Sequence, residues 1–169
     1  MKNLAVGILV FLPALAGGIA LADEQGKHGD AKGEGHVIVP LAETKWGPAP
    51  PSLPPGAQLS ILEGDPRMKG ATYTIRAKLP DGYKVPPHWH PVDENVTVLK
   101  GTLILGRGEK FNLKGAMELT VGTFSHMPKG MRHFAQAKGE TIIQVHGVGP
   151  FEVHYVNPED DPRKKPNGK

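Results

Sequence analysis

The sequence predicts an all-β domain, built as a sandwich or barrel of many short strands. Between positions 57 and 156, apolar and polar residues alternate with a period of two, which is typical of strands with one buried face. Turn residues recur at intervals of about eight to twelve positions, and we find no helical stretch of useful length. A content of 22 Gly and 17 Pro in 169 residues agrees with a β-rich domain that has many turns.

The N-terminus predicts export. Lys2 provides a charged start, residues 4–18 form an apolar stretch, and Ala20-Leu21-Ala22 is a small-residue cleavage site. The apolar stretch is shorter than the ~20 residues that span a bilayer, and Pro13 interrupts it. We therefore predict a signal peptide over residues 1–22, a periplasmic or secreted protein, and no stable membrane insertion after cleavage. The alternative is a retained membrane anchor.

Polar segments flank the predicted domain. Residues 23–45 begin with the Gly-rich stretch DEQGKHGDAKGEG and predict a flexible leader. The Pro-rich arm, residues 48–55, is expected to wrap the surface of the domain rather than join two domains. We place the domain itself at residues 46–156 and a polar C-terminal tail at residues 157–169. A homodimer formed through sheet faces or through the arm is a further expectation.

Alternating segments predict the strands, and clusters of Gly, Pro and Asp predict the turns between them. The apolar sets expected to face the core are Ala71, Tyr73, Ile75 and Ala77; Val96 and Val98; Met117, Leu119 and Val121; and Phe151, Val153 and Tyr155. The turn clusters are Pro80-Asp81-Gly82, Lys100-Gly101, Gly106-Arg107-Gly108 and Lys138-Gly139-Glu140.

Composition excludes several classes of protein. The chain has no cysteine, so disulfides, thiolate metal sites, iron–sulfur clusters and cysteine nucleophiles are excluded. The 20 Lys and Arg against 17 Asp and Glu give a net charge of +3, too small and too dispersed to indicate a nucleic-acid-binding surface. We therefore expect a small-molecule substrate or ligand and no nucleic-acid partner.

Two histidines and a glutamate are candidate metal ligands in the first half of the domain. His88 and His90 are two positions apart in a predicted strand, so their side chains project from the same face while Trp89 points away. Glu94 follows a bend that contains Pro91, and it can return a carboxylate to the same point. We therefore expect all three ligands to approach one centre.

A third histidine lies on a later predicted strand. His133 shares its face with Ala135 and Ala137, a small and apolar surface that is typical of a cavity wall. Three imidazoles and one carboxylate suit one divalent first-row transition metal, whether Fe, Mn, Ni, Zn or Cu. Around a six-coordinate ion, this set leaves two positions for water, substrate or dioxygen.

Both stretches resemble the two sequence motifs of the cupin superfamily, and residues 46–163 resemble small exported bacterial cupins of a single domain. The first motif, glycine–five–His-x-His–three–Glu–six–glycine, matches at Gly82, His88, His90, Glu94 and Gly101. The second, glycine–five–Pro-x-Gly–two–His–three–Asn, matches at Gly122, Pro128, Gly130 and His133 and departs at Ala137, which concerns a folding detail and not the ligands. The resemblance implies the double-stranded β-helix, a jelly-roll barrel. It also implies metal binding by His88, His90, Glu94 and His133.

Three further residues are candidates for chemistry beside the metal. Tyr73 lies on the apolar face of its strand and is either a core residue or a phenol in the pocket. Gln144 and His146 share a face with Ile142 and Val148. If that face lines the barrel, Gln144 is a cofactor-binding or substrate-orienting group and His146 can shuttle a proton. The alternative is ordinary core or surface hydrogen bonding.

The remaining histidines are expected outside the site. His28 and His36 lie in or beside the polar leader, and His154 falls on the polar face of its strand. His126, just before the second motif's proline, is a weaker candidate. We expect Trp89 to pack beneath a neighbouring sheet or at a dimer contact.

Three hypotheses about function follow. The leading one is a mononuclear metal enzyme, a dioxygenase-like oxidoreductase of a small organic substrate, with Glu94 as ligand and proton acceptor. A second is a redox-neutral isomerase, lyase or decarboxylase, in which the metal is a Lewis acid and Tyr73 or His146 moves the proton. A third is a non-catalytic module that binds metal or a small ligand, which a pocket without further proton acceptors would support.

Overall fold

Nine strands and three short 3₁₀-helices make up the part of the chain that the structure, a computed structural model, describes: residues 35–164. The strands are β1 (Gly47–Pro48), β2 (Gln58–Gly64), β3 (Thr72–Leu79), β4 (Lys84–Trp89), β5 (Glu94–Arg107), β6 (Met117–Leu119), β7 (Phe124–Met127), β8 (His133–Val148) and β9 (His154–Tyr155). The helices are η1 (Leu41–Glu43), η2 (Pro158–Asp160) and η3 (Pro162–Lys164). Among the described residues, no helix has the length and apolarity needed to cross a membrane. The predicted signal peptide, residues 1–22, lies outside this range.

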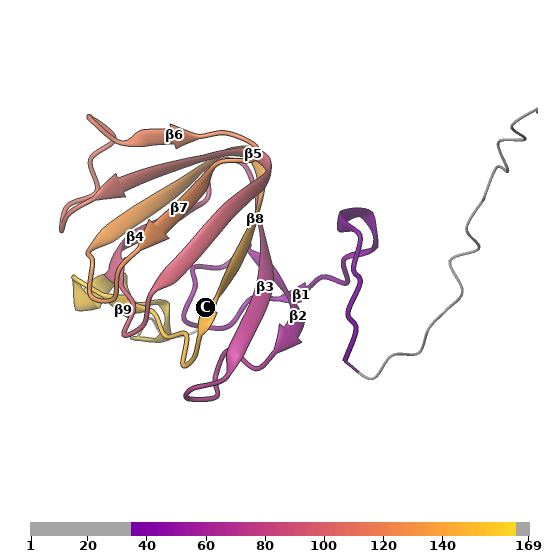
Figure 1. The fold of residues 1–169 in the computed structure, drawn as a ribbon. Helices are drawn as coiled ribbons and strands as arrows, with labels where there is room; N and C mark the ends of the chain where they lie inside the picture. The colour runs from indigo at the N-terminus through magenta and orange to yellow at the C-terminus, as the bar shows by residue number, and fades with distance from the viewer. Residues whose placement is uncertain (1–34, 165–169) are drawn as a thin grey trace, which may run out of the picture. The chain divides into compact units, whose positions relative to one another are not determined.

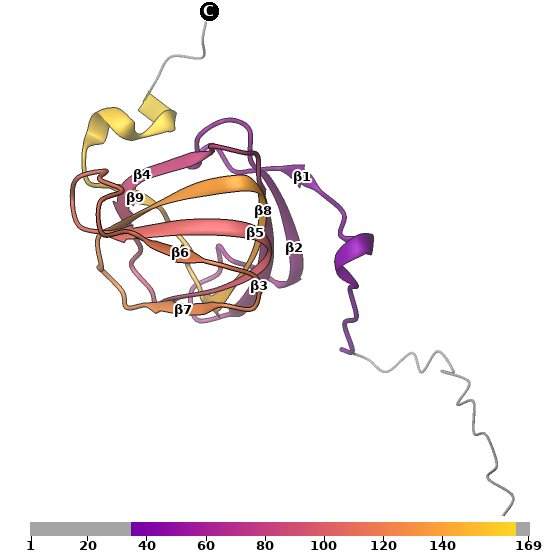
Figure 2. The same ribbon diagram turned by 90° about the horizontal axis from the view of Figure 1, so that it is seen from above.

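Strand β8 is the centre of a single curled sheet. It pairs antiparallel with β3, β4 and β5, and the sheet runs in the order β1-β2-β3-β8-β4-β9, while β5 also pairs with β6 and β7. In Figure 1, β1, β2 and β3 lie on one side of β8, and β6 and β7 lie on the other. Figure 2 shows the strands curving around a common interior. The architecture confirms the expected all-β jelly-roll barrel of the cupin type.

Strands β5 and β8 are long and bent, and they pair with each other on both sides of their bends. Residues 102–107 of β5 pair with residues 133–138 of β8, and the earlier part of β5 pairs with the later part of β8. Gly101 and Gly139, each with φ +72°, lie at the bends in the left-handed region that favours glycine. The sequence predicted turns at Lys100-Gly101 and Lys138-Gly139-Glu140, but the chain does not reverse direction at either place. Both segments are bends within continuous strands.

Gly101 has no room for a side chain, and this makes its replacement a test of the bend. An added Cβ would overlap the carbonyl oxygen of Glu140 and lie 2.8 Å from Oγ1 of Thr141. We expect Gly101→Ala to lower the free energy of unfolding by about 2–4 kcal/mol through strain and overlap. The matched control is Gly122→Ala, where φ is +84° and nothing lies within 4 Å. The free energy of unfolding of Gly122→Ala should fall by only about 1 kcal/mol. Urea denaturation measures both, and equal losses would contradict the close approach.

The predicted core faces agree with the structure in β3 and β5 and differ in β6. Tyr73, Ile75, Val96 and Val98 are all buried. In the third predicted set, Leu119 is buried, but Met117 and Val121 are 67% and 63% exposed. The reason is that β6 is a three-residue strand that pairs only with β5, so it lies at an edge of the sheet. In the fourth predicted set, only Tyr155 lies in a strand, the two-residue β9, and Val153 is buried.

Two segments before the main strands lie against the barrel. The Pro-rich arm is held at two carbonyl groups, because the hydroxyl of Tyr155 donates to Ser52 (2.8 Å) and the hydroxyl of Tyr83 donates to Pro54. Residues 39–44, expected in the flexible leader, contain η1 and accept hydrogen bonds from the buried guanidinium of Arg76. The arm therefore follows the barrel as expected, and ordered structure extends further toward the N-terminus than position 46.

Candidate metal centre

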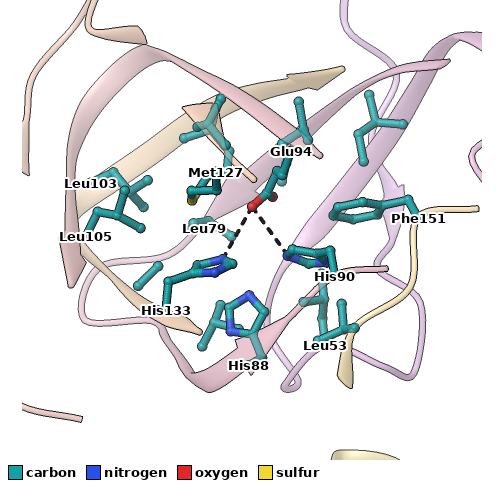
Figure 3. A pocket seen from close by; sticks show the side chains of 18 of the residues that line it. Leu53, Leu79, His88, His90, Glu94, Leu103, Leu105, Met127, His133 and Phe151 are labelled. Atoms are coloured by element: carbon teal, nitrogen blue, oxygen red, sulfur yellow. Dashed lines mark ion pairs between the residues drawn. The ribbon is translucent and has the colours of Figure 1, made fainter. Parts of the chain in front are cut away.

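The candidate ligands meet inside the barrel because the ends of three strands meet there. His88 lies near the end of β4 and faces His133, the first residue of β8, across the sheet. Their ring centroids are 4.2 Å apart. His90 follows β4 directly, with its ring 5.0 Å from that of His88 and 5.3 Å from that of His133. Glu94 opens β5, and all four residues are buried. Residues 45 positions apart thus point at one centre, as Figure 3 shows.

The side-chain atoms converge closely enough for one ion. Each of the three histidines offers one ring nitrogen, and these nitrogens lie within 4.8 Å of one another. Glu94 Oε2 lies 3.3 Å from Nε2 of His90 and 3.3 Å from Nε2 of His133. These two contacts are the dashed lines in Figure 3. The arrangement brings together the four residues that the motif spacing predicted.

Hydrogen bonds to the backbone determine which nitrogen of each ring is free to bind. In every case Nδ1 faces a carbonyl oxygen: His88 that of Pro86 at 2.7 Å, His90 that of Glu152 at 2.7 Å, and His133 that of Met131 at 2.9 Å. Because a carbonyl only accepts, each Nδ1 must carry the hydrogen, and in a neutral imidazole Nε2 then carries the lone pair. These bonds also fix the ring orientations, as the outer partners of metal-binding histidines do.

The electrostatics of the centre favour a cation. Burial, with smaller contributions from the neighbouring His133 and His90, lowers the pKa of His88 to about 3, so this ring is neutral. Burial would raise the pKa of Glu94, but attraction to His90 and His133 outweighs it and keeps this pKa below its usual range. Nε2 of His90 is buried and, despite lying 3.3 Å from Oε2 of Glu94, makes no hydrogen bond among the described residues. A neutral ring, an orphaned ring nitrogen and an ionised carboxylate around one point suit a divalent metal ion.

The four residues face a small, apolar cavity of about 70 Å³. Among the described residues that line it, only these four carry polar side chains, and the others are hydrocarbon apart from the thioether of Met127. Ala135 lines the cavity, as expected from its shared face with His133, whereas Ala137, expected on the same wall, is fully buried and does not line the cavity. The centre is therefore polar only at the predicted ligands.

Gln144 and His146 are not brought to the cavity. Because β8 is one continuous strand, the face that carries His133 continues through the bend to Ile143 and Val145, which line the cavity. Gln144 points to the opposite face, where its Oε1 accepts a hydrogen bond from Nε of Arg76 (3.2 Å). His146 is exposed. Gln144 and His146 were expected to act beside the metal only if their face of the strand lined the barrel. That face does not line the cavity, so neither residue has the expected role.

Tyr73 belongs to the core rather than to the cavity wall. It is 1% exposed, and its ring packs against Phe151 with centroids 5.6 Å apart. Its hydroxyl is buried without a partner among residues 35–164. Burial raises the pKa of this hydroxyl, and the charge of Glu94 adds to the effect. The phenol therefore stays protonated and does not supply a base.

The unpartnered hydroxyl makes Tyr73→Phe a direct test of these two interpretations. Removing it should raise the free energy of unfolding by about 1 kcal/mol, because a buried donor without a partner is destabilising. Metal affinity and turnover should not change. Tyr83→Phe is the matched control, since that hydroxyl donates to Pro54 and its loss should lower stability by about 1 kcal/mol. Urea denaturation and a metal titration give the comparison, and a tenfold loss of turnover in Tyr73→Phe would restore the catalytic interpretation.

Trp89, His126 and His154 lie outside the cavity. Trp89 points away, as expected, and stacks on the ring of His154 at 4.4 Å. His126 is exposed, and its Nδ1 lies 3.0 Å from Oδ1 of Asn95.

The sequence interpretation did not assign Leu53 or Phe151 to the site, yet both line the cavity. Leu53 is the only large apolar residue of the Pro-rich arm, and this feature of the sequence could have indicated that its side chain faces the interior of the barrel.

Comparisons with known proteins agree with this geometry. A family model described as a domain of unknown function, DUF4437, matches residues 38–168. Similar solved structures include the polyketide cyclase RemF from Streptomyces resistomycificus, with 18% identity over 75% of this chain and 89% of that chain and a TM-score of 0.59. An acetylacetone dioxygenase from Acinetobacter johnsonii has 15% identity over 76% and 82%, with a TM-score of 0.57. KdgF from Halomonas sp. has 19% identity over 68% and 94%, with a TM-score of 0.50. No curated protein matches the chain significantly. At these identities the similarity concerns the fold alone.

Proposed function

The chain belongs to the DUF4437 family within the cupin superfamily, and from this premise we propose that it is a mononuclear metal-dependent enzyme of the dioxygenase type that acts on a small organic molecule. The observation that carries the proposal is the convergence of three ring nitrogens and one carboxylate in a cavity that is otherwise apolar. The similarity in fold to an acetylacetone dioxygenase supports it.

His88, His90, Glu94 and His133 would hold the metal ion. When bound, a redox-active divalent ion would polarise an oxygen donor of the substrate and supply the electron-transfer chemistry that dioxygen requires. Fe, Mn, Ni and Cu all accept this nitrogen and oxygen donor set, as does Zn, which has no redox chemistry of its own. A zinc form would therefore fit a redox-neutral or a binding role.

The chain's own residues provide the remaining requirements. Glu94 is an ionised carboxylate among apolar side chains, so it can accept a proton from a substrate carbon or hydroxyl. The hydrocarbon wall excludes water and leaves the substrate's polar head only the ligand cluster to interact with. Phe151 stacks on the ring of His90 at 4.7 Å and shields that side of the centre. Together these groups orient one oxygen-bearing head and move one proton.

A redox-neutral reaction has less support than the dioxygenase role. An isomerase or lyase moves a proton between two positions, and the two residues considered for this role, Tyr73 and His146, lie away from the cavity. A non-catalytic binding module is the second candidate. It is favoured by a specific observation, since the described cavity wall has no titratable group besides the four ligands.

Oxygen uptake by metal-loaded protein tests the proposal. The full chain is loaded separately with Fe(II), Mn(II), Ni(II), Cu(II) or Zn(II) and given acetylacetone, catechol or a flavonol in an oxygen electrode. At least one redox-active form should consume oxygen and incorporate label from ¹⁸O₂ into the product. Turnover under strict anaerobiosis would support the redox-neutral reaction. Tight binding without conversion would support the binding module.

We also propose that the protein acts outside the cytoplasm after residues 1–22 are removed. The support is the charged start, the short apolar stretch and the small-residue cleavage site of the N-terminus. Protein isolated from the exported fraction of its own cells should begin at Asp23. An intact N-terminus in a membrane fraction would support a retained anchor.

A further inference from the structure

A second cavity lies beside the metal centre. It measures about 490 Å³, against about 70 Å³ for the inner cavity. Five residues line both: Leu53, Leu59, Ile75, Phe151 and Val153. The two spaces are therefore neighbours, separated by the side chains of these five residues.

The sizes of the two cavities limit where a substrate can lie. Small-molecule sites commonly measure about 300–1,000 Å³, so the inner cavity has room only for a small head group. The outer cavity falls within that range. A substrate whose head reaches the histidines and Glu94 must therefore extend past the shared residues into the outer cavity.

The lining of the inner cavity selects the chemistry of that substrate. A hydroxyl or amide placed against its wall, away from the four ligands, would lose its water without gaining a partner, which weakens binding. Only one end of the molecule can therefore be polar inside the barrel. The remainder must be hydrocarbon where it passes the shared residues.

The charged residues of the outer cavity are already paired. Arg67 makes two side-chain hydrogen bonds of 2.9 Å to Asp65, and Arg163 makes two of 2.8 Å to Asp161. Glu152 pairs with His154 at 2.9 Å. The rest of the lining consists of the five shared residues, Ile61, which is 51% exposed, Ser52, and the prolines at positions 48, 50 and 66. Because each charge has a partner, this cavity does not require a charged ligand.

Leu53 and Phe151 stand at the boundary between the cavities. The carbonyl groups on either side of Leu53, those of Ser52 and Pro54, are held by the hydroxyls of Tyr155 and Tyr83. The arm therefore holds Leu53 in place at the cavity wall. Phe151 is positioned by its stacking on His90. In Figure 3, both residues lie on the His90 side of the centre, opposite Leu103 and Leu105.

We propose that the two cavities together bind an elongated substrate with one oxygen-donor head at the metal centre and an uncharged hydrocarbon body in the outer cavity, and that Leu53 and Phe151 determine the width it can have. This assignment rests on the proposed metal-dependent function. It disfavours polyhydroxylated ligands such as sugars, because hydroxyl groups that pass the five shared hydrocarbon side chains would be desolvated without gaining a partner.

Alkyl hydroxamic acids test the substrate class without any need for turnover. Binding of aceto-, butano- and hexanohydroxamic acid to the Zn(II)-loaded full chain is measured by calorimetry. Affinity should rise about fourfold for each added methylene that is buried. Gluconohydroxamic acid, a polyol with the same number of carbons as the hexanoyl compound, should bind at least about 100-fold more weakly than hexanohydroxamic acid. Affinity that does not change with chain length, or equal binding of the polyol, would overturn the assignment.

Variants test the boundary at Leu53. Leu53→Ala should bind benzohydroxamic acid, which is wider than an alkyl chain, about tenfold more tightly than the original chain does. The matched control is Leu113→Ala, which is 44% exposed and lines neither cavity. The double variant Tyr83→Phe/Tyr155→Phe keeps Leu53 but removes the two hydrogen bonds that hold the Pro-rich arm. It should also raise the affinity for benzohydroxamic acid. If Leu53→Ala and Leu113→Ala behave alike, Leu53 does not determine the width.

A measurement on metal-free protein separates this inference from the proposed function. Octan-1-ol should shift the methyl NMR signals of Leu53, Leu59 and Ile61 in ¹³C-methyl-labelled protein, and sorbitol should not. If the protein takes up no metal but octan-1-ol shifts these signals, the proposed function fails and the outer hydrocarbon site stands. If the protein binds metal but octan-1-ol leaves these methyl groups unchanged, the outer site is overturned.

Discussion

Replacing His133 by alanine is expected to lower the affinity for a divalent metal ion by at least about 100-fold. Loss of a hydrogen-bond partner behind a metal-binding histidine costs about 10–100-fold, so loss of the ligand itself should exceed that range. His133 is 1% exposed and shares the centre with His88, His90 and Glu94, so no solvent-exposed group replaces it easily. Competition with a fluorescent chelator, using Zn(II) or Ni(II), measures the affinity.

Heat denaturation gives a second measure of the same loss. At a free metal concentration about 100 times Kd, binding adds about 2.7 kcal/mol to the stability of the native state. For a domain of this size, that should raise Tm by about 8 °C. The increase should fall to about 1 °C or less in His133→Ala and stay full in His146→Ala, whose side chain is exposed away from the cavity. If His133→Ala keeps the full affinity and the full increase in Tm, the metal centre is not where we place it.

Glu94→Gln is expected to lower turnover per bound metal ion by about 10²–10⁴-fold. Glutamine has nearly the same shape as glutamate, but it cannot accept a proton and carries no charge. Among the described residues that line the cavity, Glu94 is the only carboxylate, and it lies 3.3 Å from Nε2 of both His90 and His133. Oxygen uptake is normalised to the metal content measured by elemental analysis, so that loss of metal and loss of catalysis are counted separately.

Glu118→Gln is the control for this substitution. Glu118 pairs with Lys138 on the outside of the barrel at 2.8 Å, with 53% of its side chain exposed, so turnover per metal should be unchanged. If Glu94→Gln retains more than about a tenth of the turnover per bound metal, Glu94 is not the proton acceptor. It would then act only in metal binding, and the substrate would have to supply its own base.

The candidate ligands could be predicted because their placement depends on short-range geometry. His88 and His90 are two positions apart, which places them on one face of any strand. His133 follows the second motif at its expected spacing, and the cupin resemblance relates it to the first. Spacing by itself would not have joined residues 45 positions apart. His133 joins His88 because β4 pairs with β8, and that pairing is part of the cupin fold that the motifs imply.

Gln144 and His146 were expected beside the metal only if their face of the strand lined the barrel, and the structure places the other face there for a physical reason. Lys138-Gly139-Glu140 has the residue types of a turn, and Gly139 does adopt a positive φ. A local signal of this kind does not distinguish a chain reversal from a bend. The outcome depends on whether the residues beyond it stay paired with the same neighbour, and in β8 they remain paired with β5. The alternation therefore continues without interruption, and Ile143 and Val145 face the cavity instead.

The amino-acid sequence alone specifies the alternation that makes strands, the glycines that allow the bends, and the identity and spacing of the ligand side chains. These are local properties, set by backbone geometry over a few residues. The tertiary structure decided which ring nitrogen of each histidine is free, how small the inner cavity is, and that Leu53 and Phe151 line it. These depend on carbonyl groups and side chains brought together from distant positions, and close packing places such contacts only after the whole barrel has formed.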